Sequence, residues 1–127
     1  MDYGYQPGWI HVEYEEDLFQ KIISREYPAD VVFEDESIFA FHWFNPVAPV
    51  HILIIPKEKI ETINDINETN MTSAGRLIFI AKKIAADMNL AEKGYRLVFN
   101  VNPMGGQHVY HIHLHLLAGR KFTWPPG

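Results

Sequence analysis

The residues best suited to chemistry in this chain are three histidines at alternate positions near its C-terminus: His111, His113 and His115. Apolar residues lie between and after them, a period of two that is typical of a strand with one polar and one apolar face. The pattern predicts that all three imidazoles project from the same side of a sheet. Imidazole can act as a base, an acid, a nucleophile or a metal ligand near neutral pH, so the row indicates a reactive site.

A metal site is one interpretation of this row, because histidine is the commonest metal ligand. On a straight strand the first and last histidines lie roughly 13 Å apart, whereas zinc–nitrogen bonds are only about 2.0–2.1 Å long. Two adjacent histidines could share an ion with a ligand from elsewhere, but all three could not. The geometry disfavours a metal, and we expect neither a metal ion nor another cofactor.

Nucleophilic catalysis is a second interpretation, and it does not require all three histidines to reach a single point as a metal site would. The central imidazole, His113, would attack an electrophile such as phosphorus, and its neighbours would donate hydrogen bonds to the phosphoryl oxygens. One of its ring nitrogens must stay protonated, held by a nearby backbone carbonyl, so that the other can attack. The remaining interpretation is a row of solvated surface histidines, which is disfavoured for three in register beside the Gly105-Gly106 turn.

The periodicity of the sequence predicts the elements that must position this row. Asp17 is a plausible N-cap for a short helix that Pro28 ends, and Asn70 or Thr72 could cap a longer helix over residues 71–90. Short apolar runs predict strands over residues 31–34, 38–43, 51–55, 95–101 and 108–118. This count favours an α+β fold with about five mostly antiparallel strands and two helices.

Length and composition limit the possible functions. The 127 residues fit a single domain over residues 16–127, preceded by an N-terminal arm over residues 1–15. The net charge of -5 argues against a nucleic-acid partner, and the absence of cysteine excludes disulfides and thiolate metal sites. Neither a secretory signal nor an apolar stretch of roughly 20 residues is visible. We therefore expect a cytoplasmic protein that does not bind membranes.

The run His111-Ile-His-Leu-His-Leu-Leu resembles the motif of the histidine triad (HIT) superfamily of nucleotide hydrolases and transferases. The flanking sequences are similar to its Hint branch, the nucleoside phosphoramidate hydrolases. They include Asp17-Leu-Phe-Gln-Lys-Ile-Ile, Ala48-Pro-Val-His-Ile-Leu-Ile-Ile-Pro-Lys, Gly94-Tyr-Arg-Leu-Val-Phe-Asn, Gly105-Gly-Gln and Trp124-Pro-Pro-Gly. The resemblance implies a HIT-like fold and a homodimer in which each chain adds about five strands to one continuous sheet.

The resemblance also implies a pocket for a purine nucleoside monophosphate and a reaction that cleaves the P–N bond of purine nucleoside phosphoramidates. His113 would be the nucleophile, forming a covalent nucleotidyl intermediate and releasing an amine. His115 and His51 would contact the α-phosphate, and His111 would orient His113. The implied substrate-binding residues are Asn100, Gly106 and Gln107 near the phosphate, and Leu18, Phe19, Ile22 and Phe41 around the base.

Two positions depart from the family pattern. The family usually has Asp at position 43, where its carboxylate accepts hydrogen bonds from both ribose hydroxyls, whereas the indole N–H of Trp43 only donates. We therefore expect a weakened preference for ribose over deoxyribose, or a shifted ligand. Relatives commonly carry Ser at position 108, where it can assist the leaving group. His108 could protonate the departing amine instead, although strict strand parity places it on the face opposite the three histidines.

Two further functions fit the same motif. A nucleotide-binding HIT scaffold, non-catalytic or of altered specificity, is favoured by Trp43 and disfavoured by the intact histidine row. Dinucleoside polyphosphate hydrolysis, as in the Fhit branch, is disfavoured by the Gly-Gly-Gln turn and the Trp-Pro-Pro-Gly end. The sequence thus predicts a metal-free phosphoramidase, and the stiff tail at Trp124 suits docking onto the other subunit.

Overall fold

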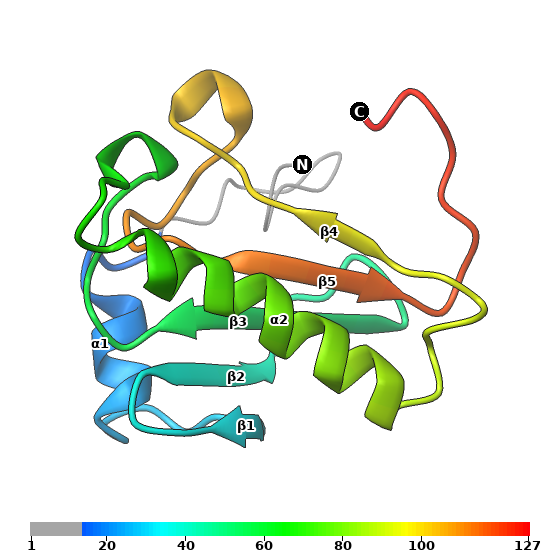
Figure 1. Cartoon of the computed structure of the whole chain (residues 1–127), viewed down its shortest axis with the longest axis horizontal. Coiled ribbons are helices and arrows are strands. Elements are labelled where there is room, and N and C mark those ends of the chain that lie inside the picture. The colour runs from blue at the N-terminus through cyan, green and yellow to red at the C-terminus, as the bar shows by residue number, and fades with distance from the viewer. Residues whose placement is uncertain (1–13) are drawn as a thin grey trace.

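A five-stranded antiparallel sheet forms the centre of the computed structural model, which describes residues 14–127 (Figure 1). The strand order is β1-β2-β3-β5-β4, so β1 and β4 form the two edges. The strands are β1 Val31–Glu34, β2 Ile38–His42, β3 Val50–Pro56, β4 Arg96–Val98 and β5 Leu114–Ala118. The helices are α1 Leu18–Ile23 and α2 Met71–Asp87, with 3-10 turns η1 Ile63–Asp65 and η2 Pro103–Gly105.

The two faces of the sheet bury different side chains, because successive residues of a strand point to opposite sides. Helix α2 runs across one face (Figure 1), where its apolar stripe packs on the aliphatic side chains of β2, β3 and β5. Helix α1 packs on the opposite face, against Phe39 and Phe41 of β2 and Leu53 and Ile55 of β3. His51 and His115 alternate with the α2-facing residues of their strands, so both project from the α1 side.

The expected α+β class, the five antiparallel strands and the two α-helices are confirmed, while several element ends differ. Helix α1 ends at Ile23, because Arg25 adopts a positive φ of 71°, well before Pro28. Helix α2 ends at Asp87 and not at residue 90. Neither Asp17 nor Asn70 caps its helix through its side chain, although each occupies the N-cap position. No helix in residues 14–127 is long and apolar enough to cross a membrane.

The predicted strand over residues 108–118 is the main error, because β5 begins only at Leu114. The β3–β5 ladder ends at the pair Ile54 and Leu114. Beyond it, Pro56 has no backbone N–H to give to a ladder, and the N–H of Ile112 donates instead to Ile60 O at 2.7 Å. Only His115 of the three histidines therefore lies within the sheet, and the expectation of one straight strand is wrong.

Strand β4 is shorter than its predicted range of 95–101 for the same reason. It comprises only Arg96–Val98 and pairs with β5 alone, from Leu117 back to His115. Strand β5 begins at Leu114, one residue before the partner of Val98, so the chain from Asn100 onward has no part of β5 opposite it. The predicted N-terminal arm, residues 1–15, lies almost wholly outside the described residues.

Candidate active site

The pair His51 and His115 forms the floor of the site, from neighbouring strands. His51 Nε2 lies 3.0 Å from His115 Nδ1, and both side chains are buried. The backbone N–H of Val47 donates to His51 Nδ1 at 3.1 Å. Since a backbone N–H can only donate, neutral His51 carries its proton on Nε2 and donates it to His115 Nδ1. His115 in turn carries its own proton on Nε2.

His113 is oriented by the chain that precedes it. Its Nδ1–H donates to the backbone O of His111 at 2.8 Å, so the proton sits on Nδ1 and the lone pair on Nε2. The ring stands 5.0 Å from the His115 ring and 4.9 Å, edge to face, from the Phe19 ring. This is the arrangement that a nucleophilic imidazole requires: one nitrogen held protonated, the other carrying the attacking electron pair.

His111 anchors the irregular segment that carries His113. Its Nε2–H donates to Pro56 O at 2.7 Å, at the end of β3. Its Nδ1 is buried and has no hydrogen-bond partner within residues 14–127. The side chain thus fixes the position of its own backbone carbonyl, the group that orients His113. This geometry suits a positioning role for His111.

All four histidines are held neutral by burial. Loss of hydration lowers the pKa of His51 and of His113 to about 4 and that of His115 to about 3. Burial also lowers the pKa of His111, although its bond to Pro56 O partly opposes the shift. Near pH 7 the imidazole of His113 is therefore unprotonated at Nε2, as nucleophilic attack demands.

Asn100 approaches the site from the chain after β4. Its Nδ2 lies 3.4 Å from His115 Nε2. The tautomers derived above place a proton on His115 Nε2, so two donors face each other there. The two N–H groups cannot bond to each other, and a phosphoryl oxygen beside them could accept from both. The expected proximity of Asn100 to the histidines is thus present in the structure.

Gln107 and Gly106 hold the loop before the histidines. The Gln107 side chain accepts from the N–H of Asn102 at 2.9 Å and donates to Glu61 O and Val109 O. The backbone N–H groups of residues 105–107 all donate to carbonyls within the same loop. These donors are therefore engaged in shaping the loop, and the geometry assigns Gln107 a supporting role.

The four residues expected around the base all lie in one buried cluster on the α1 side of the sheet: Leu18, Phe19, Ile22 and Phe41. Phe19 reaches the histidines directly, because its ring centroid lies 5.8 Å from that of His111 as well as contacting His113. Trp43 belongs to the same cluster and packs edge to face on Phe19 at 6.1 Å. An aromatic wall therefore adjoins His113.

His108 lies in the irregular segment, so strand parity does not govern its direction. Its charge is among the smaller causes that lower the pKa of His113, after burial and His111, which places the two within electrostatic reach. His42 pairs with Ile52, which faces α2, and so lies on the other side of the sheet from Phe41. No group of three metal-ligating side chains occurs in the part of the chain that the structure describes.

A profile of the HIT domain family matches residues 24–122. The chain belongs to the HIT domain family. A purine nucleoside phosphoramidase from Escherichia coli (strain K12) is 52% identical to this HIT chain over 106 residues, 84% of this chain and 89% of that protein. A 14 kDa zinc-binding protein from Zea mays is 49% identical over 112 residues, 87% of each chain.

Solved structures agree with the family assignment. The crystal structure of a HIT family hydrolase from Legionella pneumophila Philadelphia 1 matches with a TM-score of 0.84 and 58% identity, covering 87% of this chain and 98% of that one. The HIT-like fold is therefore confirmed. With its relatives and its histidine set, the chain is an enzyme of the HIT family.

Two supporting contacts escaped the sequence analysis, namely the N–H of Val47 on His51 and the carbonyl of Pro56 on His111. Both come from the backbone, which leaves no residue-type signal in a sequence. The run Ala48-Pro-Val-His resembles the family and thus marked the region, but it did not show which atom would fix the His51 tautomer.

Proposed function

We propose that this HIT family enzyme hydrolyses the P–N bond of purine nucleoside 5′-phosphoramidates through a covalent intermediate on His113. The observation that carries the proposal is the 2.8 Å bond from His113 Nδ1–H to His111 O, which presents the Nε2 lone pair as a nucleophile. The family's Escherichia coli relative, named purine nucleoside phosphoramidase, supports the choice of bond.

In the first step His113 Nε2 forms a bond to the α-phosphorus while the P–N bond breaks. The departing amine takes up a proton, for which His108 is the proposed donor. In the second step water attacks the phosphorus while His108, left neutral by the first step, takes up one of the water's protons. The bond to His113 breaks and the nucleoside monophosphate is released. His113 then regains its neutral form, so atoms and protons balance over the cycle.

Hydrogen-bond donors that converge on one point stabilise the phosphoryl oxygens. His115 Nε2–H and Asn100 Nδ2, 3.4 Å apart, both point donors at the place where a non-bridging oxygen would gain charge. His51 acts behind them, because its bond to His115 sets the tautomer that makes His115 a donor. The aromatic wall of Phe19 and Phe41 offers an apolar surface to a purine.

The deciding experiment is release of a fluorescent amine from its adenosine 5′-phosphoramidate, measured in EDTA, by the wild type and by His113→Ala. We expect turnover by the wild type and a loss of at least about a thousandfold in the variant. Undiminished turnover by the variant, or turnover abolished by EDTA, would overturn the mechanism. A folded wild type that binds AMP without any turnover would identify a nucleotide-binding scaffold.

We further propose that the enzyme is a homodimer whose sheets join through β4. Strand β4 is an edge of the sheet, and an edge strand offers unpaired main-chain groups to another chain. Helix α2 also exposes three large apolar side chains on its outer surface: Met71 at 56%, Ile78 at 52% and Phe79 at 57%. A second copy that paired along β4 and packed on α2 would cover both features.

A further inference from the structure

A cavity of about 290 Å³ is lined by residues of β4, of β5 and of the C-terminal tail. Asn100 lines it and also lies 3.4 Å from His115, so the cavity and the reacting centre share a wall. Arg96 of β4 pairs with Leu117 of β5, and the next pair on the same face of the sheet is Val98 with His115. Arg96 therefore projects from the histidine side of the sheet.

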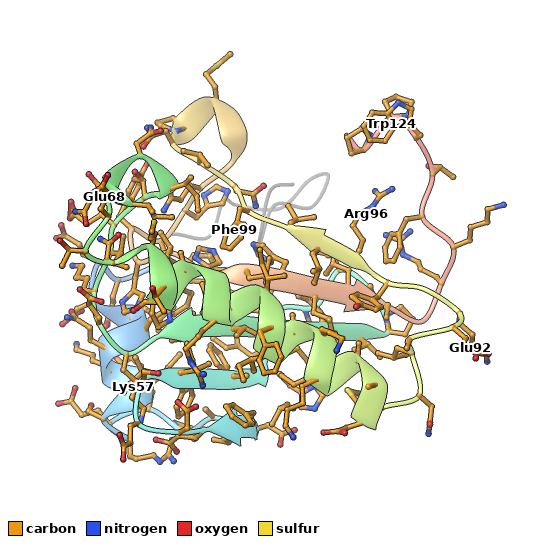
Figure 2. The ribbon with its side chains drawn as sticks, viewed as in Figure 1. Lys57, Glu68, Glu92, Arg96, Phe99 and Trp124 are labelled. Carbon is orange, nitrogen blue, oxygen red and sulfur yellow. The ribbon has the colours of Figure 1, made fainter. Side chains whose placement is uncertain are left out.

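Two guanidinium groups define this cavity, which we name the arginine cavity after Arg96 and Arg120. Both stack over the ring of Phe122, at 5.1 Å and 4.3 Å from its centroid. Arg96 also donates to Thr123 O at 2.9 Å, and Figure 2 shows it extending from β4 toward the C-terminal tail. Stacking fixes the planes of the guanidinium groups, which lowers the entropy lost when an anion binds.

The guanidinium groups of the arginine cavity form no ion pair within residues 14–127, although Gly127, which carries the C-terminal carboxylate, also lines the cavity. Within residues 14–127 no carboxylate lies within 4.0 Å of Arg96 or Arg120, whereas Arg25 and Arg76 each pair with an acidic side chain at 2.6 Å. The remaining hydrogen bonds of the two arginines go to backbone carbonyls. In a chain of net charge -5, two neighbouring guanidinium groups that form no ion pair with a carboxylate point to an anionic ligand.

We propose that the arginine cavity binds a carboxylate on the leaving amine, so that the preferred substrates are nucleoside 5′-phosphoramidates of acidic amino acids. This inference rests on the proposed P–N hydrolysis, because it assigns the other half of the same substrate. The phosphorus sits at His113, His115 and Asn100, and the amine departs toward the cavity. The carboxylate stays ionised throughout and receives forked hydrogen bonds from Arg96 and Arg120.

The test compares three adenosine 5′-phosphoramidates, each linked through the α-nitrogen: of glutamate, of glutamine and of the diamide of glutamate. These leaving groups carry two, one and no carboxylates at nearly constant shape. We expect kcat/KM to fall along the series, with glutamate at least about tenfold above the diamide, as charged hydrogen bonds of this kind imply. In Arg96→Met/Arg120→Met the ratio of glutamate to diamide falls to about one.

The matched control is Lys121→Met, which removes a positive charge beside Arg120 from a residue outside the lining of the arginine cavity. The ratio of glutamate to diamide should survive in this variant. A ratio near one in the wild type, or one that falls equally in Lys121→Met, overturns the inference and leaves only general electrostatic attraction.

Failure of this inference is separable from failure of the proposed function. Turnover of the unsubstituted adenosine 5′-phosphoramidate tests P–N hydrolysis by itself. If no compound is turned over, equilibrium binding of the glutamate compound and the diamide to wild type and to the double arginine variant decides whether the cavity selects the carboxylate. Equal binding of both compounds by the wild type overturns it.

Discussion

Each histidine of the site owes its tautomer to a backbone group. The N–H of Val47 sets His51, and through it His115, while the carbonyls of His111 and Pro56 set His113 and His111. Main-chain groups keep their roles at every pH, unlike carboxylates. The direction of every proton at the site therefore follows from the fold, and no acidic side chain is needed to orient His113.

Burial of neutral imidazoles makes stability depend on pH. The pKa values of His51 and His113 fall from 6.5 to about 4, and that of His115 to about 3, so the unfolded chain binds more protons than the folded one as acidity rises. The stabilisation is complete above pH 6.5 and is lost as pH falls toward 4. We expect the urea midpoint to be level from pH 8 to 7 and to drop steeply between pH 6.5 and 4.5.

A variant isolates the histidine contribution to this decline. His51→Gln removes one of the shifted groups, so the fall of its midpoint between pH 6.5 and 4.5 should be shallower than that of the wild type, by about 1.4 kcal/mol per pH unit at most. Parallel declines of the two proteins would show that carboxylates, and not buried imidazoles, govern acid unfolding.

Trp43 predicts weak discrimination of the sugar. A carboxylate that accepts from both ribose hydroxyls is worth tenfold or more in affinity, and the indole N–H cannot accept. We expect AMP and dAMP to bind within about threefold of each other, as measured by titration calorimetry. Trp43→Asp should raise the preference for AMP, and a strong AMP preference in the wild type would contradict this prediction.

At the scale of elements, the alternating pattern around the three histidines correctly predicted which side chains face α2. It wrongly predicted where the strand begins. Ile112, Leu114 and Leu116 all pack in the core under α2, as alternation requires, even though Ile112 lies outside β5. The strand end could not be predicted, because it depends on Ile60 O and Pro56, which are distant in sequence. The face of the sheet to which a side chain points follows from the local alternation of the sequence. The residues with which a strand pairs depend on distant parts of the chain.

The end of β5 offers a sharp test of packing. Gly119 has a φ of 95°, and a Cβ built on it would lie 2.7 Å from Pro49 Cβ. Gly119→Ala therefore adds both backbone strain and a clash with a rigid ring, and we expect it to lower the free energy of unfolding by about 3 kcal/mol. Urea unfolding at pH 7.5 measures the change.

Two other glycines serve as controls. Gly94 has a φ of 100° but no atom within 4 Å of its built Cβ, so Gly94→Ala should cost only the strain, about 1 kcal/mol. Gly75 lies inside α2 with open space around it, so Gly75→Ala should stabilise the protein by about 0.5–1 kcal/mol. Equal losses at Gly119 and Gly94 would disprove the contact with Pro49.

At the scale of the molecule, the site lies on one face of the sheet while α2 covers the other. The sequence predicted the histidines and the aromatic wall, because local patterns and family motifs mark both. It did not predict the arginine cavity, since that requires Arg96 of β4, Arg120 after β5 and Phe122 of the tail to meet in space. Contacts between residues so distant in sequence depend on the order of the strands in the sheet. The alternation of polar and apolar residues does not encode that order.

Assembly provides the last prediction. If two copies cover the outer surface of α2, Ile78→Lys/Phe79→Lys places four lysines at the interface, because a two-fold axis repeats each change. Burying the exposed halves of these side chains contributes on the order of 4 kcal/mol to dimerisation, so the dimer should weaken about a thousandfold. Analytical ultracentrifugation of the wild type at micromolar concentration should then show a dimer and the variant a monomer. Met104→Lys, which changes an exposed methionine on η2 away from α2, should leave the dimer intact. A monomeric wild type, or dimeric behaviour of the double variant, would remove α2 from the interface.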